Sequence, residues 1–224
     1  NLKENGYISS DELKKFSKTD IKLNKREVFL IEEAKSYTEE VRRIVKTEYG
    51  FERLYSQGLS ISTPLDPRLQ IAALNSLRFG IEEYDRRKGW RGPIANKFTN
   101  NNWKEILEKT NLDKTLKWEI AEVIQVNENI SKVKFIKNKK EIQISFENLK
   151  WTKKKDFSDL LNVGDFIFLG KSSQSKWDLK QIPQVNGGIV VMDPFNGEVK
   201  ALVGGYSFLS SEFNRVTQAK RQPG

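Results

Sequence analysis

Two short apolar runs near the C-terminus constrain the fold of this 224-residue chain more than any other part of it. Residues 189–192 and 198–203 are rich in β-branched side chains, and each run has the length of a buried strand. Asp193, Pro194 and Gly197 supply turn-forming residues between them. The pattern predicts a β-hairpin whose apolar faces need cover from other elements. We expect this cover from the helix over residues 69–81 or from a second copy of the chain.

A β-rich stretch precedes the hairpin. Turn-like residues at 127–129, 138–140 and 161–165 separate successive runs. Five runs at this spacing predict a small closed or partly open barrel. The predicted strands cover residues 118–126, 130–137, 141–146, 165–169 and 177–182.

Helical periodicity is strongest just after Pro67, which suits a first helical position. The helix is predicted over residues 67–80, with an apolar stripe made of Leu69, Ala72, Ala73, Leu77 and Ile81. The polar side chains of Gln70 and Asp85 invite an active-site role, but we interpret both as capping or helix-surface residues.

Residues 5–62 are mostly polar and helical in pattern. Ser10 precedes an acidic turn and is predicted to be a helix N-cap. A further helix is predicted over residues 37–45, where Tyr37, Val41 and Ile44 share one face.

The glycines and the turn of the C-terminal hairpin carry a resemblance to a known family. Residues 188–205 fit a Gly-x-x-x-x-Asp-Pro-x-x-Gly-x-Val-x-Ala-x-Val-Gly-Gly pattern, and residues 213–224 fit Phe-Asn-Arg-x-Thr-Gln-Ala-x-Arg-Gln-Pro-Gly. Both resemble the opening of the transpeptidase domain of class A penicillin-binding proteins. The resemblance implies a nucleophilic serine directly after Gly224, so no catalytic residue is expected within the chain. The implied flanking residues are Phe213, Asn214, Arg215, Arg221, Gln222, Pro223 and Gly224.

Two Ser-x-x-Lys strings inside the chain are rivals for that nucleophile. Ser131 and Lys134 lie on a predicted strand, where an offset of three sends side chains to opposite faces. Ser173 and Lys176 lie in a polar loop without an apolar helical stripe. We interpret both strings as chance occurrences.

Weaker resemblances divide the rest of the chain. Residues 6–9 are similar to the end of the family's glycosyltransferase domain, a strand is expected at 58–66, and the β-rich stretch resembles an OB-like insert found in some members. The fold class is α+β: a helical linker region, a small five-stranded OB-like β-barrel insert and the first strands of a transpeptidase sheet. The expected parts are residues 1–62 (glycosyltransferase exit and linker), 63–94 (first transpeptidase helix), 95–184 (insert) and 185–224 (opening strands).

Composition narrows the chemistry. The chain has no histidine and no cysteine, which excludes imidazole and thiol catalysis and ordinary zinc sites. No metal and no cofactor is expected. The formal net charge of +9 favours acidic partners, although a charge run is usually a solvated face. Trp151 with Lys150 and Lys153 is open to two interpretations, a binding surface or an aromatic packing site, whereas Trp118 is expected in the core.

The resemblance implies a noncatalytic portion of a bifunctional peptidoglycan synthase that uses lipid II and stem peptides and is blocked by β-lactams. It further implies a membrane anchor upstream and a location at the periplasmic face of the bacterial inner membrane. For the insert, three roles stay open: docking of an outer-membrane lipoprotein activator, contact with the glycan strand, or spacing of the two catalytic domains. No nucleic acid is expected as partner in this reading. The alternative is a stand-alone basic OB-type module that binds nucleic acid or oligosaccharide, which leaves residues 188–224 unexplained.

Overall fold

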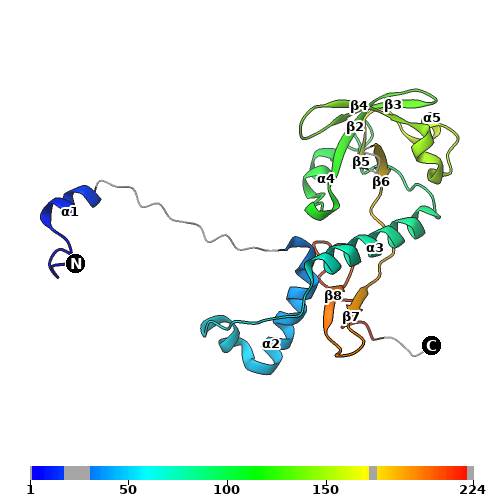
Figure 1. Ribbon diagram of the computed structural model, residues 1–224. Helices are drawn as coiled ribbons and strands as arrows, with labels where there is room; N and C mark the ends of the chain where they lie inside the picture. The colour runs from blue at the N-terminus through cyan, green and yellow to red at the C-terminus, as the bar shows by residue number, and fades with distance from the viewer. Residues whose placement is uncertain (1, 18–30, 172–175, 221–224) are drawn as a thin grey trace. The chain divides into compact units, whose positions relative to one another are not determined.

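A computed structural model describes residues 2–17, 31–171 and 176–220 (Figure 1). The chain divides into two compact units, residues 1–30 and 31–224. In the first unit, helix α1 (Ser10–Phe16) begins after Ser9, whose side-chain oxygen accepts from the backbone N–H of Glu12 at 3.3 Å. The Glu12 carboxylate accepts from the Ser9 N–H at 2.8 Å. This reciprocal pair makes Ser9 the N-cap, so the prediction of Ser10 was wrong by one residue.

Most of the second unit's strands form one six-stranded antiparallel sheet. Its order is β1-β5-β2-β3-β4, and β6 pairs with the same edge of β5 that β1 occupies. The strands are β1 (Ala95–Asn96), β2 (Trp118–Val126), β3 (Ile130–Phe135), β4 (Glu141–Ser145), β5 (Asp165–Lys171) and β6 (Trp177–Lys180). The five predicted strands are therefore present, with β1 added.

The sheet does not close on itself, so the closed form of the two predicted barrel forms was wrong. Among the described residues, β4 at one edge pairs with neither β1 nor β6 at the other. The 3₁₀ segment η3 (Phe146–Thr152) follows β4 and packs against both β4 and β6. This region also contains three short helices that the strand pattern did not predict. They are α4 (Trp103–Lys109), the 3₁₀ helix η2 (Lys114–Leu116) and α5 (Phe157–Leu160).

The core of this sheet follows from alternation along its strands. In β2 and β3, the side chains of Ala121, Val123, Val133 and Phe135 are all buried, and polar residues lie between them. Strand β5 is buried on both faces from residue 165 to 170. One face of β5 contributes Ile167 and Leu169 to the core beside Leu149, Phe157 and Leu161.

The C-terminal hairpin forms a second, two-stranded sheet. Strands β7 (Ile189–Met192) and β8 (Val199–Val203) pair antiparallel. Helix α3 (Pro67–Arg86) packs on them and lies between the two sheets (Figure 1). Ala73 and Leu74 of the helix meet Ala201 and Val203, with Leu77, Ile189 and Val191 around them. The expected cover of the hairpin by the helix over residues 69–81 is confirmed.

Helix α3 begins as its sequence predicts and continues to Arg86. The Asp66 carboxylate accepts from the N–H groups of Arg68 and Leu69, and Pro67 occupies the first turn.

The segment before α3 is not the strand that was expected at 58–66. It has no strand pairing, and its backbone contact with the hairpin is the Asp66 N–H to the Lys200 carbonyl, at 2.9 Å. Pro64 lacks an N–H, and residues 58–64 are exposed, so no ladder or core holds them as a strand.

Helix α2 (Lys35–Ser56) follows the short 3₁₀ turn η1 (Glu32–Ala34) and contains a break at Gly50, where φ is 84°. A positive φ of this size is accessible mainly to glycine. The α2 residues before the break pack against β8. No helix in the described part of the chain is both long and apolar enough to cross a membrane.

Candidate functional site

The segment after β8 packs closely against the hairpin at two glycines, Gly188 and Gly204. A Cβ at Gly204 would come within 2.6 Å of Oδ1 and 2.8 Å of Cα of Asn214. A Cβ at Gly188 would come within 2.8 Å of a Val216 methyl group. Real Cβ atoms do not approach this closely, so the path of residues 213–217 requires glycine at both positions.

Residues 213–220 form a turn pinned at several points. The Gln218 N–H donates to the Asn214 carbonyl at 2.8 Å, and the Asn214 N–H donates to Gln218 Oε1 at 2.8 Å. The Arg215 N–H donates to the Gly204 carbonyl at 3.0 Å. We call residues 213–220 the flanking segment. It contains Phe213, Asn214 and Arg215 of the predicted site, whereas Arg221, Gln222, Pro223 and Gly224 lie outside the described residues.

Replacing Gly204 with alanine is expected to displace the flanking segment and to lower the free energy of unfolding by about 1–3 kcal/mol, because the new methyl group meets Asn214 backbone. Hydrogen exchange at residues 213–218 and urea unfolding measure the two effects. Gly80→Ala is the matched control, since a Cβ there meets nothing within 4 Å and α3 gains helix propensity. Unchanged exchange at 213–218 in Gly204→Ala would contradict the close approach.

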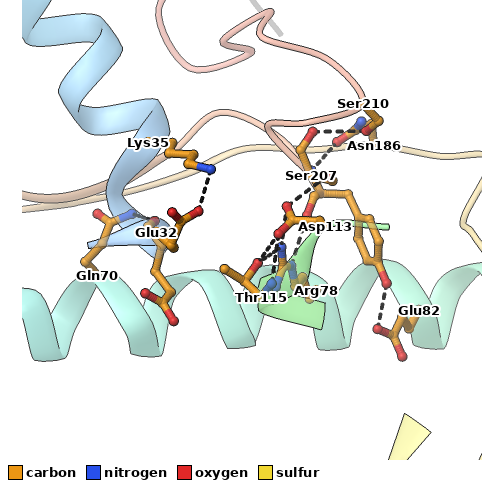
Figure 2. A network of polar contacts seen from close by, with 12 residues as sticks. Glu32, Lys35, Gln70, Arg78, Glu82, Asp113, Thr115, Asn186, Ser207 and Ser210 are labelled. Atoms are coloured by element: carbon orange, nitrogen blue, oxygen red, sulfur yellow. Dashed lines mark hydrogen bonds and ion pairs between the residues drawn. The ribbon is translucent and has the colours of Figure 1, made fainter. Parts of the chain in front are cut away.

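A buried polar network holds the residues that follow β8 (Figure 2). Arg78 lies on the covered face of α3 and is 7% exposed. Its Nε donates to the Tyr206 carbonyl at 2.9 Å. Its Nη2 donates to Thr115 Oγ1 at 2.8 Å and to the Asp113 carboxylate at 3.3 Å. The Ser207 hydroxyl donates to the same Asp113 carboxylate at 2.9 Å. One guanidinium thus ties the exit of β8 to the loop before β2.

The charges in this network are set by burial and by each other. Burial lowers the pKa of Arg78, and the Asp113 carboxylate opposes that shift. For Asp113, burial raises the pKa, but hydrogen bonds from Thr115 and Ser207 and the charge of Arg78 outweigh it, and the net pKa is lowered. Both groups are therefore charged at neutral pH and form a paired, hydrogen-bonded unit.

Tyr206 extends the network to the six-stranded sheet. Its hydroxyl donates to Glu82 at 2.8 Å, and Glu82 also pairs with Lys180 of β6 at 2.7 Å. Burial and the neighbouring Glu82 raise the pKa of Tyr206, so it stays a neutral donor. Trp118 packs between Phe168 and Tyr206, beneath the Lys180 ammonium. Trp118 is half-buried at this junction rather than in the sheet's core.

Two polar residues of α3 have roles that differ from the sequence interpretation. Gln70 is fully buried, and its amide bonds both backbone groups of Leu202 and the Glu33 carbonyl. Asp85 is 2% exposed and accepts from Arg91, from Gln181 and from the backbone of residue 184. Interpreting them as capping or helix-surface residues was wrong because helical spacing does not show which polar side chains meet buried backbone.

The sequence left Trp151 open to two interpretations, a binding surface or an aromatic packing site. In the structure the residue is partly buried. Its ring lies edge-on to Trp90 at 6.0 Å between centroids, and the Arg86 guanidinium lies 5.2 Å from it. The indole N–H is buried and has no hydrogen-bond partner among the described residues. Lys150 and Lys153 are exposed. This packing favours the aromatic packing site, and the binding surface remains a prediction.

Ser131 and Lys134 lie on β3, as the sequence predicts, and do not form a nucleophile pair. The Ser131 side chain is buried and donates to the Gln125 carbonyl at 2.9 Å, whereas Lys134 is on the other face. The string at 173–176 includes residues outside those described. Sequence reasoning missed Arg78, Asp113 and Tyr206, although a charged residue at a stripe position of α3, between Leu74 and Ile81, is the usual signal of a buried ion partner.

Comparison with known proteins identifies the class to which this fold and site belong. Residues 90–185, which include the whole six-stranded sheet, match the family described as the penicillin-binding protein OB-like domain. Together with the similarities below, which cover 97–99% of this chain, this match supports its assignment as a fragment of a class A penicillin-binding protein.

The relatives found are named penicillin-binding protein 1A. The protein from Rickettsia prowazekii is 40% identical over 225 residues, which cover 99% of this chain and 28% of the relative. The protein from Escherichia coli is 29% identical, with the same two coverages. The crystal structure of penicillin-binding protein 1A from Haemophilus influenzae matches 97% of this chain and 32% of that one, with 27% identity and a TM-score of 0.67. The chain therefore spans under a third of the length of these relatives.

Proposed function

We propose that the protein containing this chain is a bifunctional peptidoglycan synthase of the bacterial cell wall. It polymerises lipid II into glycan strands and cross-links D-Ala-D-Ala stem peptides through an acylated serine, the step that β-lactams block. The observation that carries this proposal is the flanking segment, because its sequence fits the family pattern and two glycines hold it against the hairpin. The similarity to penicillin-binding proteins 1A over 99% of the chain supports it further.

In this proposal the residues of this chain contribute to the reaction by positioning the segment that leads to the serine. The proposed serine follows the flanking segment, where a helix start and a lysine one turn on would favour the nucleophile. Gly188, Gly204 and the Arg215 N–H fix the segment that leads to it. We propose the parts 1–62, 63–94, 95–184 and 185–224 as the exit of the glycosyltransferase domain, the first transpeptidase helix, the OB-like insert and the opening strands.

The proposal extends to the cellular location of the protein and to a partner of the insert. It acts at the periplasmic face of the inner membrane, held by an anchor upstream of this chain. An outer-membrane lipoprotein activator docks on the OB-like insert. The groove between α4 and β2, about 830 Å³ in volume, supports docking there because apolar Leu107, Ile120 and Ile136 line it and Lys117 and Lys137 give it cationic groups.

Acylation by a fluorescent penicillin tests the proposed reaction. We expect no labelling of residues 1–224 alone and covalent labelling of a version extended through the Ser-x-x-Lys segment and the rest of the transpeptidase domain. Labelling that is lost when the serine after Gly224 becomes alanine places the nucleophile. Changing Ser131 to alanine in the extended protein is the matched control and leaves labelling unchanged. Labelling of neither version would contradict the proposal.

A further inference from the structure

One carboxylate on helix α2 is bonded to the flanking segment. Glu40 Oε2 accepts from the Thr217 hydroxyl at 2.8 Å and from Asn214 Nδ2 at 3.2 Å. The same oxygen pairs with Arg43 of its own helix at 2.7 Å. Glu40 and Thr217 are 177 residues apart in the sequence, so this contact is purely tertiary. The Glu40 side chain is 18% exposed, which shields these bonds in part from water.

Asn214 is placed so that its amide can serve only two groups. It is 2% exposed, and its Oδ1 accepts from the Val216 N–H at 3.0 Å within the flanking segment. Its Nδ2 then points to Glu40. The amide oxygen thus stabilises the turn, and the amide nitrogen bonds that turn to α2. Loss of the Glu40 acceptor would leave a buried amide donor without its partner.

The Arg43 partner shows that this contact is not tuned for stability alone. Its Nε is buried and has no hydrogen-bond partner among the described residues. A buried, unpaired donor costs stability, and an apolar side chain would avoid that cost. The arginine instead places a positive charge beside Glu40 Oε2, the same oxygen that accepts from Asn214 and Thr217.

The same two turns of α2 also hold the strand that leads into the segment. The Tyr37 hydroxyl donates to the Val199 carbonyl of β8 at 2.9 Å. Residues 37 and 40 therefore fix the start of β8 and the turn beyond its end, while Gly50 breaks the helix ten residues further on. A shift of α2 would move the flanking segment directly.

We propose that Glu40 is a positioning residue for serine acylation, acting through Asn214 and Thr217 to set the path of the flanking segment. This inference rests on the proposed function. Helix α2 lies in the proposed linker, before the transpeptidase residues. The contact of Glu40 with Asn214 and Thr217 therefore couples the position of α2 to the rate at which the serine is acylated. Misplacement of a reacting group by about 1 Å costs up to about 100-fold in rate, so a single lost anchor can slow acylation without unfolding the domain.

The test compares four single variants in the extended protein. We expect Glu40→Ala and Thr217→Val to slow the second-order rate of acylation by fluorescent penicillin about tenfold, as loss of a charge-assisted bond would. Glu40→Gln keeps an acceptor oxygen and is expected to remain within about threefold of the wild type. Glu39→Ala is the matched control, because Glu39 makes the same kind of i, i+3 pair with Arg42 and no bond to the segment, and its rate stays within about twofold.

Two further measurements separate positioning from general stability. Thermal unfolding identifies a temperature at which all variants are folded, and rates are compared there. Hydrogen exchange at residues 213–218 reports the anchor itself, without any acylation, and is expected to rise in Glu40→Ala and not in Glu39→Ala. The double variant Glu40→Ala/Thr217→Val is expected to be no slower than Glu40→Ala, because Glu40→Ala already removes the contact with Thr217.

Each outcome decides the question. Faster exchange with an unchanged acylation rate would show that the anchor exists and does not position the serine, and the inference would be overturned. Unchanged exchange in Glu40→Ala would overturn it at the level of the contact. If the extended wild type is not labelled at all, the proposed reaction fails, and the inference about acylation fails with it, while the exchange result still decides whether Glu40 holds the segment.

Discussion

Replacing Asp85 with alanine is expected to lower the free energy of unfolding by about 3 kcal/mol, the range for breaking a buried ion pair. The Asp85 carboxylate is 2% exposed and holds the Arg91 guanidinium through two bonds, at 2.8 and 3.0 Å. Its loss also frees the backbone N–H of Gln184 and the amide of Gln181. These partners come from the segment between β6 and β7, so α3 loses its tie to the chain between the two sheets. Urea unfolding followed by tryptophan fluorescence measures the change.

The matched control for Asp85 is Glu83→Ala on the same helix. The Glu83 side chain is 48% exposed, and its pair with Arg86 is long at 3.4 Å. Its removal is expected to change stability by no more than about 0.5 kcal/mol. Equal losses in the two variants would contradict the buried-pair argument.

Asp85 also gives the stability a dependence on acid pH. Burial raises the pKa of this carboxyl, but bonds from Arg91, Gln184 and Gln181 outweigh burial, and the net pKa lies below its ordinary 3.8. The folded state therefore holds the proton less tightly than the unfolded chain does. The contribution is present above the ordinary pKa and is lost as the pH falls through the lower folded value. Asp85→Asn is expected to show a smaller loss of stability below pH 3.8 than the wild type.

Replacing Gln70 with leucine is expected to cost about 3 kcal/mol, although the two side chains have similar volumes. Gln70 Oε1 accepts from the Leu202 N–H at 2.9 Å, and Nε2 donates to the carbonyls of Leu202 and Glu33 at 3.1 and 2.9 Å. Leucine leaves these backbone groups buried and unpaired, at about 1–3 kcal/mol for each group that finds no water. Hydrogen exchange of the Leu202 amide and urea unfolding report the local and global effects.

Asn75→Ala is the control for Gln70, because it removes an exposed amide from the same helix and improves helix propensity. It is expected to be neutral or slightly stabilising. A Gln70→Leu variant as stable as Asn75→Ala would show that the outer edge of β8 does not need its side-chain partner.

Gln70 explains why the edge of β8 was not predictable. The hairpin was predicted from its own residues, and the apolar cover that it was expected to need is supplied by α3. A strand edge, however, needs N–H and C=O partners and not apolar ones. Here Gln70 bonds Leu202 and the Asp66 N–H bonds Lys200, and neither a helical stripe nor a strand alternation encodes that match.

The short helices show a related limit. Strands β2 to β6 were predicted because turn-like residues separate short runs of strand length, a signal visible within a few residues. Helices α4 and α5 have seven and four residues, too few for a period of 3.6 to emerge. The sequence did not decide between a closed and a partly open barrel, because the neighbours of an edge strand depend on tertiary packing, here that of η3 against β4 and β6.

The sequence by itself determined strands β2 to β8, helix α3 and the family pattern around residues 188–205 and 213–220, because local periodicity, turn residues and motif spacing depend on neighbours in the chain. Only the tertiary structure decided that Gln70 and Asp85 are buried, that Arg78 joins Asp113 to Tyr206, and that Glu40 meets Asn214 and Thr217. The physical reason is that a polar side chain's partner lies tens to hundreds of residues away. It becomes identifiable only when burial removes water as the alternative partner.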